Sequence, residues 1–273
     1  MTGPVVLVGC GNMGRAMLEG WIASGRLAPQ QALVVEPADA LRARATALGA
    51  TGLTDAGGIG EDVAPRLVVF AVKPQVILDV IPAYARFRDS ATYVSVAAGT
   101  PIAAFEQLLG ADAAVIRCMP NTPAAIGKGM MVTVANRHVA PDAAGFVRDL
   151  LAASGEVTEI ADEGLMDAVT AVSGSGPAYV FHFIECLTAA GEAAGLPADT
   201  AKLLAMQTVY GAASLAAESR EEPGELRRQV TSPNGTTAAA LSVLMGGDRL
   251  KALVTEAVEA ARIRSVELRG PSA

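Results

Sequence analysis

The sequence contains few residues of the kinds that build metal sites and disulfide frameworks. It has two histidines and three cysteines among 273 residues. Cys10, Cys118 and Cys186 are far apart and odd in number, so we expect no disulfide framework. His138 and His182 belong to no cluster with metal-ligand spacing, which predicts that the protein binds no metal.

The sequence also lacks an excess of basic residues and any long apolar run. Its formal net charge is −7 and its pI is near 5.0, which argues against binding to nucleic acid. No apolar stretch reaches the roughly eighteen residues that a membrane helix needs. The first residues, MTGPVVLVGCG, carry no basic leader, and their apolar run is too short for a signal peptide. We therefore expect a cytoplasmic protein with no nucleic-acid or membrane partner.

What the first half of the chain does contain is a series of short, continuously apolar runs. Five of them are rich in β-branched residues and lie at 5–9, 32–36, 67–72, 92–98 and 114–120. Such runs are typical of a parallel sheet covered on both faces, and helical patterns lie between them. Two more strand-like runs, GMMVTVAN and EVTEI, end near residue 160. The expected fold is an α/β, doubly wound Rossmann-type domain over residues 1–161.

The strand pattern stops after Asp162, and long, alanine-rich helical patterns follow. They predict helices to about Val172, then to about Ala194, from Pro197 to about Ser219, and over Thr236–Met245 and Asp248–Leu268. The segment YVFHFIECLTAAGEAAG has little polar face, so its helix must be buried on several sides and His182 is expected in the core. We expect an all-α domain over residues 162–273 that dimerises through interlocked helices. The alternative is a bundle covered by the chain's own Rossmann domain.

A glycine-rich motif, GCGNMG, follows the first strand and opens the first helix. Gly9, Gly11 and Gly14 permit a tight turn, close approach of a pyrophosphate, and packing of helix on strand. The second strand ends in Glu36, where the acid that binds the adenosine ribose is expected. Because this carboxylate would repel a 2′-phosphate, we predict that NADH is preferred over NADPH. The alternatives are a glycine turn without a cofactor and a solvated acid at a strand end.

Three later strands end in segments that belong to the same edge of the predicted sheet. They are AVKP (Ala71, Val72, Lys73, Pro74), VAAGT, which begins with Val96, Ala97 and Ala98, and MPNTP, which begins with Met119, Pro120 and Asn121. The carboxyl ends of strands line the ligand crevice in open α/β sheets. Lys73 could touch a cofactor phosphate or ribose, and the small residues suit a flat nicotinamide. Taken singly, each segment could also be an ordinary turn.

The segment VTSPNGTTAAALSVL places small hydroxyl residues and a glycine before a helical pattern. Ser232, Gly235, Thr236 and Thr237 stand at the expected helix N-terminus, where free N–H groups and the helix dipole favour an anion. Since the loop itself contains no basic residue, it fits a small carboxylate better than a polyphosphate. Thr237 would donate a hydrogen bond to the ligand. Ordinary N-capping without a ligand is the alternative.

These segments together give the chain a resemblance to pyrroline-5-carboxylate reductase, the family of enzymes that makes proline. The resemblance rests on GCGNMG, FAVKPQ, SVAAGT, RCMPNTPAAIGKGM, VSGSGPAYVF and VTSPNGTTAAALSVL, which occur in the order of the family. It implies that NADH or NADPH meets Val8, Gly9, Cys10, Gly11, Asn12, Met13 and Glu36, together with Ala71–Pro74 and Val96–Ala98. It also implies that Gly235, Thr236 and Thr237, with Ser232 beside them, hold the carboxylate and ring nitrogen of the substrate, 1-pyrroline-5-carboxylate.

The resemblance further implies an assembly and a reaction. Family members dimerise through the helical domain, their active site lies between the Rossmann cleft of one subunit and the helical domain of the other, and rings of dimers occur. The reaction is hydride transfer to the C=N carbon, for which Thr237 is the expected catalytic residue through a hydrogen bond or proton relay to the nitrogen. The chain departs from the family pattern at Asn234, where glycine is commoner, at Gln229, where asparagine is frequent, and at Glu36, where a small hydroxyl residue is often found.

Three other functions fit parts of the same pattern. A β-hydroxyacid dehydrogenase shares the two-domain layout but needs a lysine on the interdomain helix, and no lysine occurs between Lys128 and Lys202. A reductase of another cyclic imine would use the same parts, and turnover of five- and six-membered carboxylated imines separates the two. A non-catalytic relative would bind NADH without imine-dependent oxidation.

Overall fold

The computed structural model describes residues 3–268, which divide into two compact units. Unit 1 comprises residues 3–175 and 261–268, and unit 2 comprises Gly176–Ala260. The chain therefore leaves unit 1 later than the expected division after residue 161 and returns to it near the C-terminus. A boundary at 161 between two independently folding domains stays a prediction.

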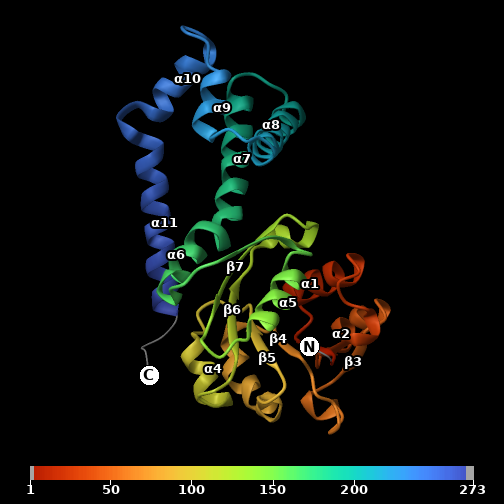
Figure 1. The fold of residues 1–273 in the computed structure, drawn as a ribbon. Helices are drawn as coiled ribbons and strands as arrows, with labels where there is room; N and C mark the ends of the chain where they lie inside the picture. The colour runs from red at the N-terminus through yellow and green to blue at the C-terminus, as the bar shows by residue number, and fades with distance from the viewer. Residues whose placement is uncertain (1–2, 269–273) are drawn as a thin grey trace. The chain divides into compact units, whose positions relative to one another are not determined.

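Unit 1 is built on an eight-stranded sheet with the strand order β3-β2-β1-β4-β5-β6-β7-β8 (Figure 1). The strands are β1 Val5–Val8, β2 Ala32–Val35, β3 Thr51–Leu53, β4 Leu67–Phe70, β5 Thr92–Ser95, β6 Val115–Met119, β7 Gly129–Ala135 and β8 Gly155–Glu159. Neighbouring strands are parallel except β6 and β7, which are antiparallel. This confirms the predicted Rossmann-type sheet. Its order reverses at β1, where a ligand crevice is expected.

Helical segments cover both faces of this sheet. They are α1 Asn12–Ala23, α2 Asp39–Ala47, α3 Pro74–Val80, α4 Ile102–Leu109, α5 Pro141–Leu151 and α6 Met166–Val169, with short 3₁₀ segments η1 Pro29–Gln31, η2 Ala56–Gly58, η3 Ile81–Phe87, η4 Thr122–Ile126 and η5 Glu163–Leu165. Leu7 faces the core formed with α1, α2 and α5, whereas its neighbour Val6 faces the core formed with α3, η3 and α4. Because successive side chains of a strand point to opposite faces, β1 is apolar throughout, as predicted.

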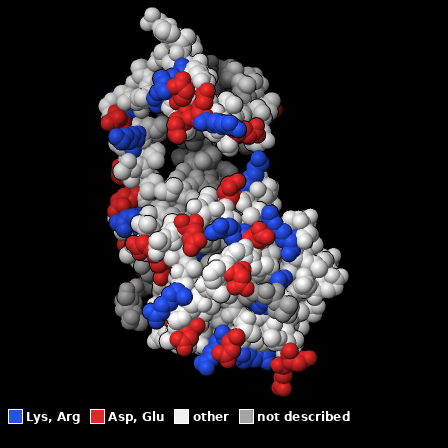
Figure 2. All heavy atoms as spheres, in the orientation of Figure 1, with Lys and Arg blue, Asp and Glu red and all other residues white. Residues whose placement is uncertain are grey.

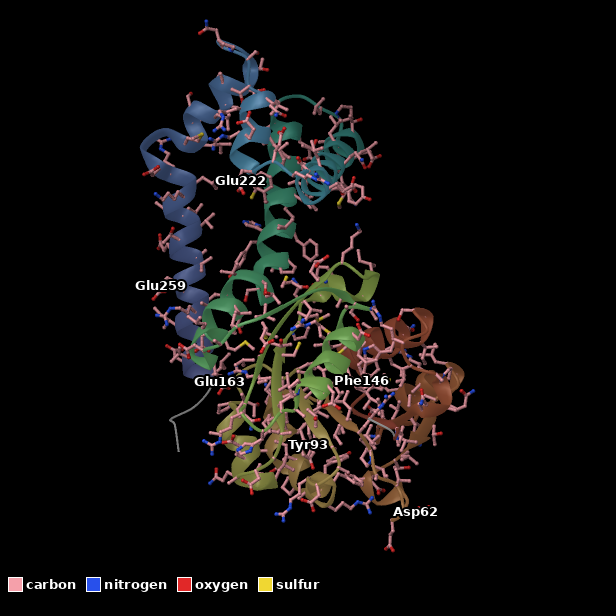
Figure 3. The ribbon with its side chains drawn as sticks, in the orientation of Figure 1. Asp62, Tyr93, Phe146, Glu163, Glu222 and Glu259 are labelled. Carbon is pink, nitrogen blue, oxygen red and sulfur yellow. The ribbon has the colours of Figure 1, made fainter. Side chains whose placement is uncertain are left out.

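Figure 3 labels one aromatic residue from each core. Phe146 of α5 packs against the first core, and the Arg66 guanidinium lies over its ring at 3.9 Å. Tyr93 of β5 belongs to the second core, and its hydroxyl donates to the Tyr84 carbonyl at 2.8 Å. A satisfied hydroxyl makes the burial of a tyrosine favourable.

Polar contacts hold the segment that follows β8 to the rest of unit 1. Asp162 caps η5 by accepting the Gly164 N–H at 2.8 Å. Glu163, labelled in Figure 3, pairs at 3.0 Å with Arg117, a buried residue of β6. A π-helical turn, η6 Thr170–Gly174, then leads to unit 2.

Unit 2 consists of helices with little core of their own. They are α7 Gly176–Ala193, α8 Ala198–Glu218, α9 Pro223–Gln229, α10 Thr236–Met245 and α11 Arg249–Leu268, whose last residues lie in unit 1, with η7 Gly246–Asp248 before α11. Among the described residues of this unit, only Ala201 and Ala205 are buried apolar side chains. Large apolar side chains such as Phe181, Leu203 and Leu253 are exposed. This unit therefore has apolar surface available for another chain.

Charged side chains of both signs lie on the face of the molecule drawn in Figure 2. Described acidic and basic side chains are mixed there over both units. Within the described part of the chain, no helix combines the length and apolar character that crossing a bilayer requires.

Candidate active site

The turn between β1 and α1 uses its three glycines for three different reasons. Gly9 has a φ of 92°, a conformation that other residues rarely adopt. A Cβ at Gly14 would lie 2.3 Å from the Gly9 carbonyl oxygen, so only glycine lets α1 approach β1 this closely. A Cβ at Gly11 would meet no other described atom within 4 Å. Since nothing within the chain requires glycine there, the open space beside Gly11 fits a pyrophosphate approaching the backbone.

A cavity of about 620 Å³ lies at the carboxyl ends of β1, β2 and β4. The predicted cofactor residues that line it are Val8, Gly9, Gly11, Glu36, Ala71, Val72 and Lys73. Leu41, Thr54, Asp55 and Tyr84 line it as well, and the sequence analysis did not single them out. Its volume is that of a typical small-molecule site, and its place at the reversal of strand order fits the nucleoside part of a dinucleotide.

Glu36, directly after β2, directs its carboxylate at the glycine turn. The residue is 7% exposed. Its Oε2 accepts the N–H of Cys10 at 2.8 Å, and its Oε1 accepts the N–H of Ala38 at 2.9 Å. Each carboxylate oxygen has a second acceptor position. Glu36 can therefore hold the turn in place and also accept a hydrogen bond from a ribose hydroxyl.

Arg42 of α2, six positions after Glu36, binds the backbone that leads from this residue into α2. Its Nη1 donates to the carbonyls of Glu36 at 2.8 Å and Pro37 at 3.1 Å, and its Nη2 pairs with Asp39. These contacts direct the guanidinium to the start of α2. The cavity lining itself carries two carboxylates, Glu36 and Asp55, and the ammonium of Lys73.

A second cavity, of about 440 Å³, lies between residues of α1 and η4. It is lined by Asn12 and Met13, which were predicted to meet the cofactor, and by Thr122 and Ala125 of η4, among others. Both predicted residues open α1, whose N-terminal N–H groups favour an anion. The glycine motif thus contributes to two adjacent hollows of unit 1.

The other predicted cofactor residues line neither of these cavities. They are Cys10, Gly14, Pro74, Val96, Ala97, Ala98, Met119, Pro120 and Asn121. Val96 and Ala97 are buried, one in each core of the sheet, so their side chains serve packing. Both ends of the Asn121 side-chain amide are used within the chain: Nδ2 donates to the Ser173 carbonyl at 3.0 Å and Oδ1 accepts the Met130 N–H at 2.9 Å.

The predicted substrate segment lies in unit 2 and leads into α10, which begins at Thr236 as expected. The N–H of Gly235 donates to the Ser232 carbonyl at 3.1 Å, and Asn234 between them has a φ of 60°. Asparagine is among the few residues other than glycine that tolerate this left-handed conformation. Asn234 can therefore occupy a position where the family pattern more often has glycine.

The start of α10 presents several hydrogen-bond donors together. The first bond within the helix runs from the Ala239 N–H to the Gly235 carbonyl, so the N–H groups of residues 236–238 have no helical acceptor. A Cβ at Gly235 would lie 2.4 Å from Ser232 Oγ, so glycine allows that hydroxyl to lie against the turn. Thr236 is exposed and Thr237 is half-buried. This arrangement can hold a small carboxylate.

Two of the thiols are kept in the protonated form by their surroundings. Burial, and after it the Glu36 carboxylate, raises the pKa of Cys10, and burial raises the pKa of Cys118 to about 12. Neither is poised as a nucleophile, because the thiolate is the reactive form. In the single chain the side chain of His182 is 75% exposed, and its ring contacts Glu185 at 3.0 Å. Its burial in a core completed by a second chain stays a prediction.

Comparisons with known proteins agree with this geometry. Residues 163–268 match the family model described as pyrroline-5-carboxylate reductase dimerisation, and residues 4–99 match the model described as NADP oxidoreductase, coenzyme F420-dependent. A pyrroline-5-carboxylate reductase from Pseudomonas aeruginosa is 41% identical over 266 residues, which cover 97% of this chain and 96% of that protein. The chain belongs to the pyrroline-5-carboxylate reductase family.

Solved structures of other pyrroline-5-carboxylate reductases share this fold over nearly the whole chain. The structure from Coxiella burnetii has a TM-score of 0.92 and 34% identity, and covers 98% of this chain and 99% of its own. The structure from Plasmodium falciparum, with NADP bound, has a TM-score of 0.83 and 28% identity with the same coverage. The family's fold is thus present here without a missing element.

Proposed function

We propose that the protein reduces 1-pyrroline-5-carboxylate to L-proline with a reduced nicotinamide dinucleotide, the last step of proline biosynthesis. The observation that carries the proposal is the start of α10, where the N–H groups of residues 236–238 lie beside the Ser232 hydroxyl, for which the missing side chain of Gly235 leaves room. The glycine turn and its cavity in the same chain support a dinucleotide partner. The identity of 41% to a reductase of this name supports the substrate.

The mechanism that follows relies mainly on positioning. When bound, the dinucleotide supplies a hydride from the nicotinamide to the C=N carbon. The glycine turn holds the pyrophosphate and Glu36 the adenosine ribose, while the start of α10 holds the substrate carboxylate. Thr237 acts as the catalytic residue by hydrogen-bonding the ring nitrogen or relaying a proton to it, because a protonated imine is the better electrophile. Holding both reactants in register accounts for most of the acceleration.

The proposal includes a preference for NADH over NADPH. Glu36 and Asp55 bring two carboxylates to the 620 Å³ cavity. A 2′-phosphate placed beside Glu36 would meet a carboxylate that already accepts two backbone N–H groups. Two like charges about 4 Å apart oppose binding by on the order of a few kcal/mol in a partly buried site.

The proposal also includes the assembly and its place in the cell. The match of residues 163–268 to a dimerisation model indicates self-association, and the exposed apolar side chains of unit 2 support a dimer. In such a dimer each active site takes the dinucleotide from one subunit and the substrate segment from the other, and dimers can join into rings. The cysteines are free in the described structure, which suits the cytoplasm.

An absorbance assay of NADH and NADPH oxidation tests the function directly. We expect oxidation that depends on 1-pyrroline-5-carboxylate and yields proline. A six-membered carboxylated imine should turn over more slowly. Faster turnover of the larger ring would favour the alternative function, reduction of another cyclic imine, and dinucleotide binding without any imine-dependent oxidation would contradict both.

A further inference from the structure

The carbonyl of Ser173 cannot have the partner that an α-helix would give it. In an α-helix the N–H of residue i+4 donates to the carbonyl of residue i, and the residue four positions after Ser173 is Pro177, which has no N–H. The chain here forms the π-helical turn Thr170–Gly174, in which the N–H of Ser175 donates to the Thr170 carbonyl at 2.8 Å. Such turns are frequently found at functional sites.

The side chain of Asn121 supplies a donor for this carbonyl from another part of the fold. Its Nδ2 donates to the Ser173 carbonyl at 3.0 Å, while its Oδ1 accepts the N–H of Met130 in β7 at 2.9 Å. One amide thus joins the end of β6, the start of β7 and the π turn. A second contact lies next to it, since a Cβ at Gly174 would be 2.6 Å from Met119 Cε. The absence of a side chain at Gly174 lets this methyl group lie against the turn.

We infer that Asn121 is a positioning residue for the reduction and that its side chain is not a ligand of the cofactor. The inference rests on the proposed function. Met119 and its neighbours end β6 at the edge where the nicotinamide is expected, and the π turn lies one residue before Gly176, where unit 2 begins. Asn121 holds this last turn of unit 1 to that edge, and so fixes the backbone of both segments of unit 1. An error of about 1 Å in the placement of reactants costs on the order of a hundredfold in rate.

Asn121→Asp tests this inference, because it removes the amide donor and keeps an oxygen for the Met130 N–H. We expect amide hydrogen exchange in residues 170–175 to accelerate about tenfold or more, since the turn loses its anchor. We expect kcat to fall about tenfold or more. The Kd for NADH, measured by fluorescence titration without substrate, should change less than about twofold, because the 620 Å³ cavity is lined by residues between 8 and 84.

Asn136 offers a matched control at the other end of the β6–β7 pair. Its Nδ2 donates to the Ala113 carbonyl and to Glu106 Oε1, both at 2.8 Å, and its Oδ1 accepts the Val115 N–H at 3.1 Å. Asn136→Asp makes the same chemical change in a similarly bonded amide. It should lower the Tm but leave kcat and the exchange of residues 170–175 within about twofold of the parent protein.

Pro177→Ala provides a test by rescue, since it returns a backbone N–H to Ser173. We compare the loss of kcat that Asn121→Asp causes in the Pro177→Ala background with the loss that it causes in the parent protein. The first loss should be at least about threefold smaller than the second. Should Asn121→Asp not fold, Asn121→Ala, which removes the donor without adding charge, takes its place in the same comparison.

Several outcomes would overturn the inference. They are unchanged exchange and kcat in the Asn121 variant, equal losses of kcat in both asparagine variants, and a weaker Kd for NADH with kcat preserved. A parent protein without reductase activity would contradict the proposed function instead. The exchange of residues 170–175 would then still show whether Asn121 anchors the turn.

Discussion

Glu36 is a buried carboxylate that holds the glycine turn, and we propose that it also binds the cofactor. It accepts the N–H groups of Cys10 and Ala38, and it lines the cavity proposed for adenosine. Glu36→Gln keeps an oxygen acceptor and removes the charge, so the ratio of kcat/KM for NADPH to that for NADH should rise about tenfold or more. Glu61→Gln, a matched change at an exposed acid outside the cavity lining, should leave the ratio unchanged. A parent enzyme that already prefers NADPH clearly would refute the predicted preference.

In the proposed mechanism, Thr237 is the residue on which the chemical step depends most. Thr237→Ala should lower kcat/KM for 1-pyrroline-5-carboxylate by roughly a hundredfold, because the imine nitrogen loses its hydrogen-bonding or proton-relay partner. The Kd for NADH should not change. Thr231→Ala is the control, since that hydroxyl donates to the Arg227 carbonyl at 2.6 Å within the same segment, and its loss should affect kcat/KM less than about twofold. Unchanged turnover in Thr237→Ala would rule out the assigned role.

The sequence placed Glu36 at a strand end and the residues around Gly235 at a helix start, because both positions have recognisable composition, and the structure has them there. Their binding roles stay predictions. The role of Asn121 was missed, because its partner Ser173 lies 52 positions away in the sequence. Pro177 lacks the N–H that would bond the Ser173 carbonyl, and the packing of β6 against the π turn decides which side chain replaces it. No local sequence pattern encodes that packing.

At the scale of elements, two glycines of the β1–α1 turn have different expected roles: Gly14 in packing and Gly11 in ligand binding. Gly14→Ala should destabilise the protein by about 2 to 3 kcal/mol, because its Cβ would lie 2.3 Å from the Gly9 carbonyl oxygen. Gly11→Ala should cost at most about 1 kcal/mol, since its Cβ enters open space, yet it should weaken NADH binding about tenfold or more. Thermal denaturation and fluorescence titration of both variants measure the two effects. Equal Tm losses, or full NADH affinity in Gly11→Ala, would contradict this division.

The elements that the sequence failed to predict are short or polar. β3 has three residues, none fully buried, and α9 spans PGELRRQ, which has almost no apolar stripe. β3 forms because β2 completes its hydrogen bonding, as in the pairing of Val34 with Gly52. The short, continuously apolar strands were predicted because burial on both faces of the sheet leaves a continuous pattern. The bounds of α10 agree with the expected Thr236–Met245.

At the scale of the whole molecule, unit 2 exposes more apolar surface than a monomer should keep. Phe181 on α7 is 60% exposed, and the described part of α7 contains no buried residue. We expect sedimentation at micromolar concentration to show a dimer or a larger assembly. Phe181→Asp should shift it toward monomer, because an unpaired charge in an apolar interface costs several kcal/mol. Leu78→Asp, on a 52% exposed residue of α3, should leave the assembly intact; a monomeric parent protein would contradict the proposal.

The most direct test of the central claim is to locate deuterium in the product when the reduced dinucleotide carries deuterium at nicotinamide C4. The account predicts proline with one deuterium on the ring carbon that was the imine carbon. It also predicts that Thr237→Ala slows this transfer without redirecting it. Proline formed without deuterium at that carbon, or dinucleotide oxidation that labels no proline, would contradict the account.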